Sequence, residues 1–159
     1  MPELTSTERR AAHIKLLLMD CDGVLTDGRL WLIEDGDERK SFSARDGLGL
    51  ELWHRAGLKS GIISGRSSSA VDRRANELGV EYVRQGSQNK VQVFEELLKL
   101  ADVEESEVAV IGDDLNDIPL MKRAELAVAV ADAAEEARAV AHYVTKAKGG
   151  LGAVREAVE

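Results

Sequence analysis

Residues 16–24 read Leu-Leu-Leu-Met-Asp-Cys-Asp-Gly-Val, and the rest of the chain is organised around them. The four apolar residues form a short, bounded run, which is typical of a strand buried on both faces of a parallel sheet. Asp20 and Asp22 follow it, where the strand should open into a loop. In open α/β sheets, ligands bind at that carboxyl edge. An ordinary strand followed by an Asp-Gly turn is the alternative interpretation.

The composition predicts one globular domain over residues 1–159. Apolar residues make up 44% of the chain and charged residues 31%, as in soluble proteins with a buried core. The net charge of −8 argues against a general partner role with nucleic acid or an anionic membrane. The chain has neither a signal-peptide pattern nor an apolar run long enough to span a membrane, so a cytoplasmic location is expected.

Cys21 is the single cysteine of the chain. One cysteine excludes an intrachain disulfide and a multi-cysteine metal site. Because it lies between two acids, its side chain is expected to alternate away from them into the packing, and a redox role is not favoured.

Strands and helices alternate along most of the chain. Residues 1 to about 13 are expected to form a loose or short helical lead-in, and a loop over 43–47 should lead into the first long helix. Further strands are expected at 58–63, 80–83, 108–111, 126–130 and 143–145, and helices at about 48–56, 67–78, 89–101, 119–121, 133–141 and up to 159. This alternation predicts an α/β fold, a Rossmann-like parallel sheet with helices on both faces.

A small β-hairpin is predicted over about residues 28–42, as the single insertion after the first strand. Its two arms flank an Asp-Gly turn. Trp31 and Ile33 should form one face, and Leu30 and Leu32 the other. A hairpin of this size is not stable alone, so apolar residues on both faces predict contact with another subunit and hence a homo-oligomer. The alternative is that the body of the domain covers both faces.

Polar residues follow four of the predicted strands. They are Asp20 and Asp22, then Ser64-Gly65-Arg66, then Lys90, and finally Asp113, Asp114 and Asp117. The carboxyl ends of parallel strands meet at one edge of a sheet. Acids, a hydroxyl, a lysine and more acids at four strand ends therefore predict one shared site.

The chemistry that suits this set of side chains is phosphoryl transfer, which needs a cation, hydrogen-bond donors and an aligned nucleophile. Asp20 can attack phosphorus to give an aspartyl-phosphate. Asp22 can protonate the leaving oxygen and later activate water. Ser64 can donate a hydrogen bond to a phosphate oxygen, and Lys90 can bind the phosphate and offset the neighbouring acids.

Magnesium is the predicted cofactor, with Asp20, Asp22 and Asp113 as its ligands. Mg²⁺ is a hard cation that takes a few carboxylates and keeps several waters. Asp114 and Asp117 are expected to touch its waters or to orient its ligands.

Each of these polar residues also has an ordinary structural interpretation. Ser64 could cap the helix that follows it, and Asp114 and Asp117 could cap theirs. Lys90 could be a solvated surface lysine. These alternatives stay open from the residues alone.

The ordered motifs resemble those of the haloacid dehalogenase-like superfamily of phosphatases. The run Asp20–Gly28 is similar to the first motif, and Ser64, Lys90 and Gly112–Asp117 are similar to the second, third and fourth. Within that superfamily the chain resembles the 3-deoxy-D-manno-octulosonate 8-phosphate phosphatases in several stretches: 42–49, 64–66, 85–86 with 90, 129–133 and 149–156.

This resemblance implies a Mg²⁺-dependent phosphatase of an acidic sugar phosphate, with a short hairpin and no large cap. It also implies tetramers in which neighbours close each other's active sites. The residues that it implies for the sugar-phosphate pocket are Asp22, Ser43, Ala44, Arg45, Asp46, Gly47, Gly65, Arg66, Arg74 and Lys90. Arg66 and Arg74 are expected two turns apart on one helix, and the arginine fork suits a carboxylate or phosphate.

Two other functions stay open. One is a phosphatase of a nine-carbon sialic-type sugar phosphate or of another small phosphate. Nine-carbon relatives tend to have an acid where this chain has Arg66, which favours the eight-carbon sugar. The other is a catalytically silent oligomerisation module, against which the intact Asp20, Asp22, Lys90 and Asp113 argue. A response-regulator receiver domain also uses clustered acids and a lysine, but it lacks two acids at this spacing after the first strand and the inserted hairpin. That class of protein is therefore not favoured.

Overall fold

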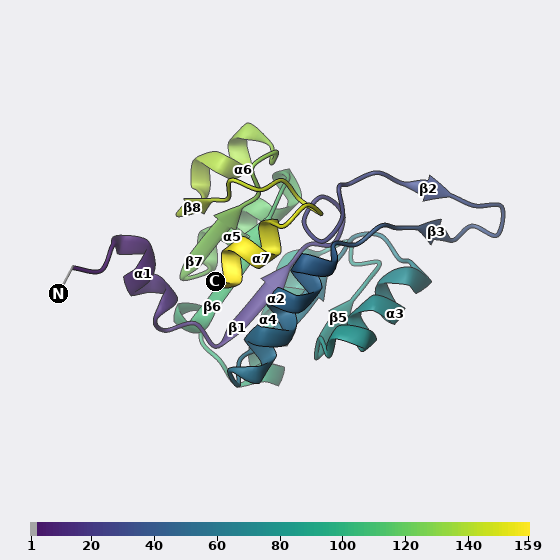
Figure 1. Cartoon of the computed structure of the whole chain (residues 1–159). Coiled ribbons are helices and arrows are strands. Elements are labelled where there is room, and N and C mark those ends of the chain that lie inside the picture. The colour runs from purple at the N-terminus through teal and green to yellow at the C-terminus, as the bar shows by residue number, and fades with distance from the viewer. Residues whose placement is uncertain (1–2) are drawn as a thin grey trace.

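A parallel sheet lies at the centre of the structure, a computed structural model that describes residues 3–159 (Figure 1). Its strands are hydrogen-bonded in the order β5 (Tyr82–Arg84), β4 (Lys59–Ile63), β1 (Leu16–Met19), β6 (Val108–Gly112), β7 (Leu126–Ala129) and β8 (Tyr143–Val144). All neighbouring pairs run parallel. The predicted α/β fold is confirmed.

The first strand, β1, takes the central position because its side chains are apolar on both faces. Leu16, Leu17, Leu18 and Met19 are all buried. Cys21 is buried as well, and burial raises the pKa of its thiol to about 12, which agrees with a packing role.

The chain order reverses between β1 and β6. From β1 the chain crosses to β4 on one side, and from β6 it crosses to β7 on the other. Ligands bind outside the carboxyl ends of strands at such a reversal. The loops after β1 and β6 carry the predicted acids.

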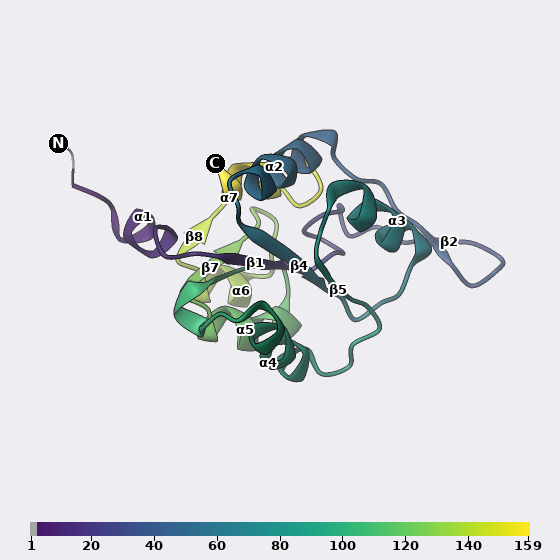
Figure 2. The same ribbon diagram turned by 90° about the horizontal axis from the view of Figure 1, so that it is seen from below.

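Helices cover both faces of the sheet, as the alternation predicted (Figure 2). One face holds α2 (Ala44–Arg55), α3 (Ser69–Leu78) and α7 (Ala153–Val158), and the other holds α4 (Lys90–Ala101), α5 (Ile118–Arg123) and α6 (Glu135–Val140). The lead-in contains a short helix, α1 (Ser6–Ala11), and residues 1–2 of that prediction lie outside the described residues. No helix within residues 3–159 combines the length and the apolar character needed to cross a membrane.

The predicted loop over residues 43–47 is wrong, because α2 already begins at Ala44. Ser43 is its N-cap and accepts a hydrogen bond from the Asp46 amide. The helix packs against α7 through small residues, and a Cβ atom at Gly49 would lie 3.1 Å from the Arg155 backbone. Leu48 and Leu52, four residues apart, are left exposed, whereas Leu50 is buried.

The predicted hairpin is confirmed and projects from the body of the molecule (Figure 1). Its strands β2 (Trp31–Leu32) and β3 (Glu38–Arg39) pair antiparallel. Trp31 is 62% exposed and Leu32 is 72% exposed, so residues 3–159 of the same chain leave both largely uncovered.

Candidate active site

The structure brings the residues at the strand ends together around one cavity of about 170 Å³. The cavity is lined by Asp20, Asp22, Ser64, Gly65, Arg66, Asp113, Asp114 and Asn116. These residues come from the loops after β1, β4 and β6, at the carboxyl edge of the sheet. Asn116 was not among the predicted residues, although it lies within the fourth motif.

Lys90 begins α4 and is buried behind the cavity. Its Nζ lies 3.1 Å from Asp20 Oδ2 and 2.8 Å from Asp117 Oδ1. The interpretation of Lys90 as a solvated lysine is therefore wrong. Burial alone would lower the pKa of Lys90, but the two carboxylates outweigh it and the pKa is raised, so the ammonium keeps its charge.

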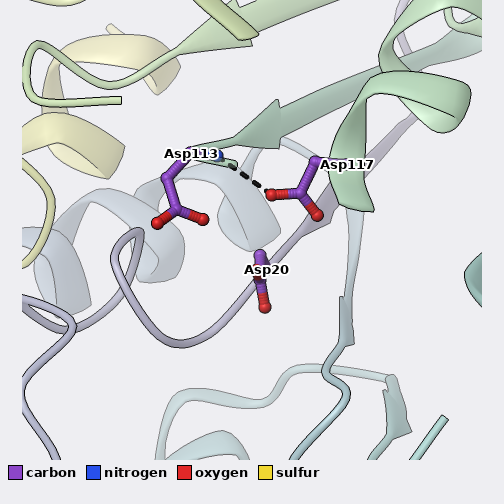
Figure 3. Close-up of side chains that lie close together, drawn as sticks. All are labelled: Asp20, Asp113 and Asp117. Carbon is purple, nitrogen blue, oxygen red and sulfur yellow. Dashed lines mark hydrogen bonds between the residues drawn. The ribbon is translucent and has the colours of Figure 1, made fainter. Parts of the chain in front are cut away.

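Asp117 holds the acidic loop after β6 in shape. Its Oδ2 accepts a hydrogen bond from the backbone amide of Asp113 at 3.0 Å (Figure 3). The same oxygen accepts from the amide of Asp114 at 3.3 Å. Its Oδ1 accepts from Lys90. Asp114 caps the short 3₁₀ helix η2 (Leu115–Asp117), so its capping interpretation is confirmed. Both oxygens of Asp117 are occupied, which favours the orienting role that stays a prediction for it.

A cluster of three carboxylates fits a hard cation. Asp20, Asp113 and Asp117 place carboxylate oxygens within 4.8 Å of one another (Figure 3). Asp113 Oδ1 is buried and has no hydrogen-bond partner in the described part of the chain. Crowded acids and an unpartnered oxygen are what a divalent cation with oxygen ligands, such as Mg²⁺, would satisfy.

The pKa values of this cluster point the same way. Burial, followed by the charge of Asp117, raises the pKa of Asp20 to about 6. Burial, followed by the charge of Asp20, raises the pKa of Asp113 to about 8. Both carboxyl groups resist ionisation side by side, and a cation between them would restore the charged forms.

Gly23 lets the loop after β1 approach the acidic cluster. Its φ is +89°, and a Cβ atom there would lie 1.9 Å from Asp113 Oδ2. Any other residue would be strained in its backbone and would displace that carboxylate. The glycine after Asp22 is therefore required by the site as well as by the turn.

The Asp22 carboxylate lies outside the cluster of three acids. Lys40 donates a hydrogen bond to its Oδ1 at 2.5 Å. Asp22 nevertheless lines the same cavity. Its predicted contact with Mg²⁺ and its acid–base role stay predictions.

Two charged residues of the hairpin arm at the site were missed from the sequence. Lys40 also donates to Glu38 Oε2 at 2.9 Å, and Glu38 Oε1 accepts from Arg66 Nε at 2.7 Å. A run of charged residues after a turn is typical of a solvated strand, so the sequence did not predict a contact between these residues and the site. The alternation that places residues 38 and 40 on one face was the available signal.

Ser64 follows β4 and is buried at the cavity. Its Oγ accepts a hydrogen bond from the Arg66 amide at 3.3 Å, which leaves the hydroxyl hydrogen for a ligand. The helix-cap interpretation is wrong for Ser64, because Ser68 caps α3 and accepts from the Ala70 amide. The helix begins at Ser69, so Arg66 precedes it and does not share it with Arg74, contrary to the prediction.

Several residues implied for the substrate pocket lie away from this cavity. Asp46, in the segment 43–47, accepts a hydrogen bond from the Arg155 amide at the start of α7. Arg45 is exposed, and Arg74 lines a separate groove between the hairpin and α3. The substrate-binding roles of these residues stay predictions.

The chain is similar in sequence to known hydrolases. A profile of the haloacid dehalogenase-like hydrolases matches residues 82–157. The 3-deoxy-D-manno-octulosonate 8-phosphate phosphatase of Yersinia pestis is 44% identical over 148 residues, which is 93% of this chain and 79% of that protein. The protein of the same name from Escherichia coli K12 is 42% identical over 147 residues, covering 92% and 78%.

A solved structure agrees with these relatives. The 3-deoxy-D-manno-octulosonate 8-phosphate phosphatase of Moraxella catarrhalis, in complex with magnesium, phosphate and KDO, has a TM-score of 0.91 to this chain. The identity is 43%, and the match covers 94% of this chain and 86% of that one. A magnesium ion in that relative agrees with the Mg²⁺ predicted for the carboxylate cluster.

A parallel sheet with two acids after its central strand, a buried lysine and an acidic loop after β6 defines a haloacid dehalogenase-like hydrolase without a large cap. The similarity in sequence and structure to the relatives described above places the chain more narrowly, in one family of that class. The chain belongs to the family of 3-deoxy-D-manno-octulosonate 8-phosphate phosphatases, and it is a phosphatase.

Proposed function

We propose that this chain hydrolyses 3-deoxy-D-manno-octulosonate 8-phosphate to the free sugar acid and phosphate. The observation that carries the proposal is that Arg66 lines the same cavity as Asp20 and Asp113. Arg66 donates to Glu38 through Nε and Nη2, and its side chain is 49% exposed, so the remaining N–H groups of the guanidinium can bind the carboxylate of this sugar acid on an otherwise acidic protein. The relatives described above are phosphatases of this substrate by name.

Asp20 is the proposed nucleophile. Its Oδ1 accepts a hydrogen bond from the Cys21 amide at 2.6 Å and its Oδ2 lies beside Lys90, so the carboxylate has one orientation. Attack on phosphorus breaks the bond to the sugar oxygen and gives an aspartyl-phosphate. Asp22 gives its proton to the departing oxygen, then takes a proton from the water that hydrolyses the intermediate.

The remaining residues stabilise charge on the transferred group. Ser64 can donate its hydroxyl hydrogen to a phosphate oxygen, and Lys90 keeps the surrounding acids compensated. Mg²⁺, which the carboxylates of Asp20 and Asp113 would hold, would screen the phosphate from the neighbouring acids.

Phosphate release across a panel of substrates tests this function. The panel holds eight-carbon and nine-carbon sugar-acid phosphates and neutral sugar phosphates, each with and without Mg²⁺. We expect Mg²⁺-dependent turnover with a clear preference for the eight-carbon acid. A preference for the nine-carbon acid, or equal turnover of neutral sugars, would reject the proposed substrate but keep the chemistry.

We also propose that the chain forms a homotetramer through the hairpin. Trp31 and Leu32 are neighbours on the projecting hairpin and are 62% and 72% exposed, and such an apolar patch favours a partner surface. Trp31→Glu should lower the particle mass measured by light scattering, because a charge at the interface centre is costly. Leu100→Glu, at an equally exposed leucine on α4, is the matched control and should keep the mass unchanged. An unchanged mass in the Trp31 variant would reject the hairpin as the interface.

A further inference from the structure

A chain of alternating charges joins the hairpin to the candidate active site. Arg66 donates to Glu38, Glu38 accepts from Lys40, and Lys40 donates to Asp22. Two of these residues line the cavity, Arg66 and Asp22. The two between them belong to the hairpin arm.

The series of ion pairs from Arg66 to Asp22 differs from a surface salt-bridge network because its two central side chains are buried. The Lys40 side chain is 1% exposed and the Glu38 side chain 6%. Removing two charges from water costs free energy that their mutual attraction rarely exceeds. The pair is therefore poorly explained as a device for stability.

The hairpin arm is fixed against the body at this point. The Glu38 carbonyl accepts a hydrogen bond from Ser68 Oγ at 3.0 Å, at the N-cap of α3. Because Glu38 and Lys40 are two residues apart in an extended segment, both side chains project from the same side of it. A rigid strand thus presents a lysine to Asp22.

Each carboxylate assigned to the reaction has its own buried lysine. Lys90 bridges Asp20 to Asp117, and Lys40 bridges Asp22 to Glu38. In each case the second carboxylate lies outside the cavity lining and holds the lysine in place. The arrangement around Asp22 repeats the one around the proposed nucleophile.

We propose that Lys40 is a positioning residue for Asp22, and that Glu38 holds Lys40 in the orientation this requires. Lys40 occupies Oδ1 of Asp22 and so leaves the other oxygen to exchange a proton with the reacting group. Lys40 does not line the cavity that holds Asp20 and Asp22 but the groove between the hairpin and α3, so it acts through the Asp22 carboxylate. The inference rests on the acid–base role proposed for Asp22, and it does not depend on which sugar is the substrate.

The test compares leaving groups. An alkyl phosphate releases an alkoxide that needs a proton from Asp22, whereas p-nitrophenyl phosphate releases a phenolate that does not. In Lys40→Met, kcat/KM should fall about 100-fold for a primary alkyl phosphate, because a misplaced acid loses that order of rate. It should fall less than about 5-fold for p-nitrophenyl phosphate.

Equal losses for both substrates would overturn the inference, because they would mean general damage or lost attraction for phosphate. Unchanged kinetics would overturn it too. Glu38→Gln should shift the ratio of the two kcat/KM values in the same direction by a smaller factor. Lys15→Met, which removes a lysine paired with Glu107 at the far edge of the sheet, should leave the ratio unchanged.

Two further measurements protect the test. If Lys40→Met does not fold, the double variant Glu38→Gln/Lys40→Met removes the uncompensated hairpin carboxylate and is measured in its place. A crystal structure of the variant should show the Asp22 side chain in another rotamer, and an unmoved carboxylate would overturn the inference. Wild-type turnover of p-nitrophenyl phosphate and simple alkyl phosphates without turnover of acidic sugars would reject the proposed substrate alone.

Discussion

The two edges of the sheet carry the same kinds of ion pair in opposite settings. At the amino edge, the side chains of Lys15 and Glu107 are 63% and 25% exposed. At the carboxyl edge, those of Lys90 and Asp20 are 6% and 9% exposed. The chemistry of each pair is the same, and water makes the difference.

That difference in exposure separates ion pairs of little consequence from those with a functional role. Exposed pairs contribute about 0–1 kcal/mol to stability. Buried pairs cost desolvation that their attraction barely offsets, and breaking one leaves an uncompensated charge. The Lys15–Glu107 pair is exposed at one edge and the Lys90–Asp20 pair is buried at the other. The buried charges therefore serve a purpose other than stability.

The largest effect is expected from Asp20→Asn at the carboxyl edge. Loss of the nucleophile should lower phosphate release by a factor on the order of 10⁴ or more. The fold should persist, because asparagine keeps the shape and Lys90 keeps its bond to Asp117. A thermal melt alongside the phosphate assay checks both points.

The matched control for that variant is Glu107→Gln at the amino edge, which should keep full activity. Full activity in the Asp20 variant would reject Asp20 as the nucleophile. It would also reject a functional role for the buried ion pair that Asp20 forms with Lys90.

Replacing the lysine of each edge measures the same contrast as stability. Lys90→Met strands Asp20 and Asp117 in the interior and should lower the free energy of unfolding by about 3–5 kcal/mol. Lys15→Met should change it by less than about 1 kcal/mol. Denaturant titration at one pH gives both values, and equal losses would show that burial is not what distinguishes the two edges.

The sheet-borne part of the site was predictable because its signals are local. The apolar run before Asp20 predicts both the strand and the place where it ends. The same pattern precedes Ser64 and Asp113, and parallel topology then brings these ends to one edge. No knowledge of side-chain contacts was needed.

The hairpin-borne part was not predictable in the same way. The contact between Lys40 and Asp22 depends on where the returning arm of the hairpin passes the loop after β1, which no short stretch of sequence encodes. Arg66 was misplaced on a helix because residues 67–69 are all serines, each a competent N-cap. In α2, Leu48 and Leu52 have the spacing of one helical face, but the face that packs against α7 is the one that carries Gly49.

Close backbone contact is a second feature of the carboxyl edge that substitution can break. A Cβ atom at Gly149 would lie 1.7 Å from the carbonyl oxygen of Gly23, in the loop that follows Asp22. Gly149→Ala should therefore push that loop aside, lower stability by about 1–3 kcal/mol and reduce turnover. Leu151→Ala, at an exposed side chain two residues on, should leave unfolding midpoint and activity unchanged. Comparable results for the two variants would show that the loop has room to yield.

The smallest effect is expected at the amino edge, at His142. Its Nδ1 accepts a hydrogen bond from the Ala127 amide at 2.9 Å, which requires an unprotonated nitrogen. Burial, followed by the positive charge of Arg10, lowers the pKa of His142 below its ordinary value of 6.5. The unfolded chain therefore binds the proton more readily, so this contribution is present above about pH 6.5 and is lost as the pH falls through the folded-state pKa.

His142→Asn isolates this contribution, because the amide oxygen can accept the same hydrogen bond and does not titrate. From pH 7.5 to pH 5 the wild-type protein should lose slightly more stability than the variant, by an amount within about 0.5 kcal/mol. Other titrating groups are shared by both proteins and cancel in the difference between their unfolding midpoints. An identical pH dependence would show that His142 binds its proton equally well in the folded and the unfolded chain.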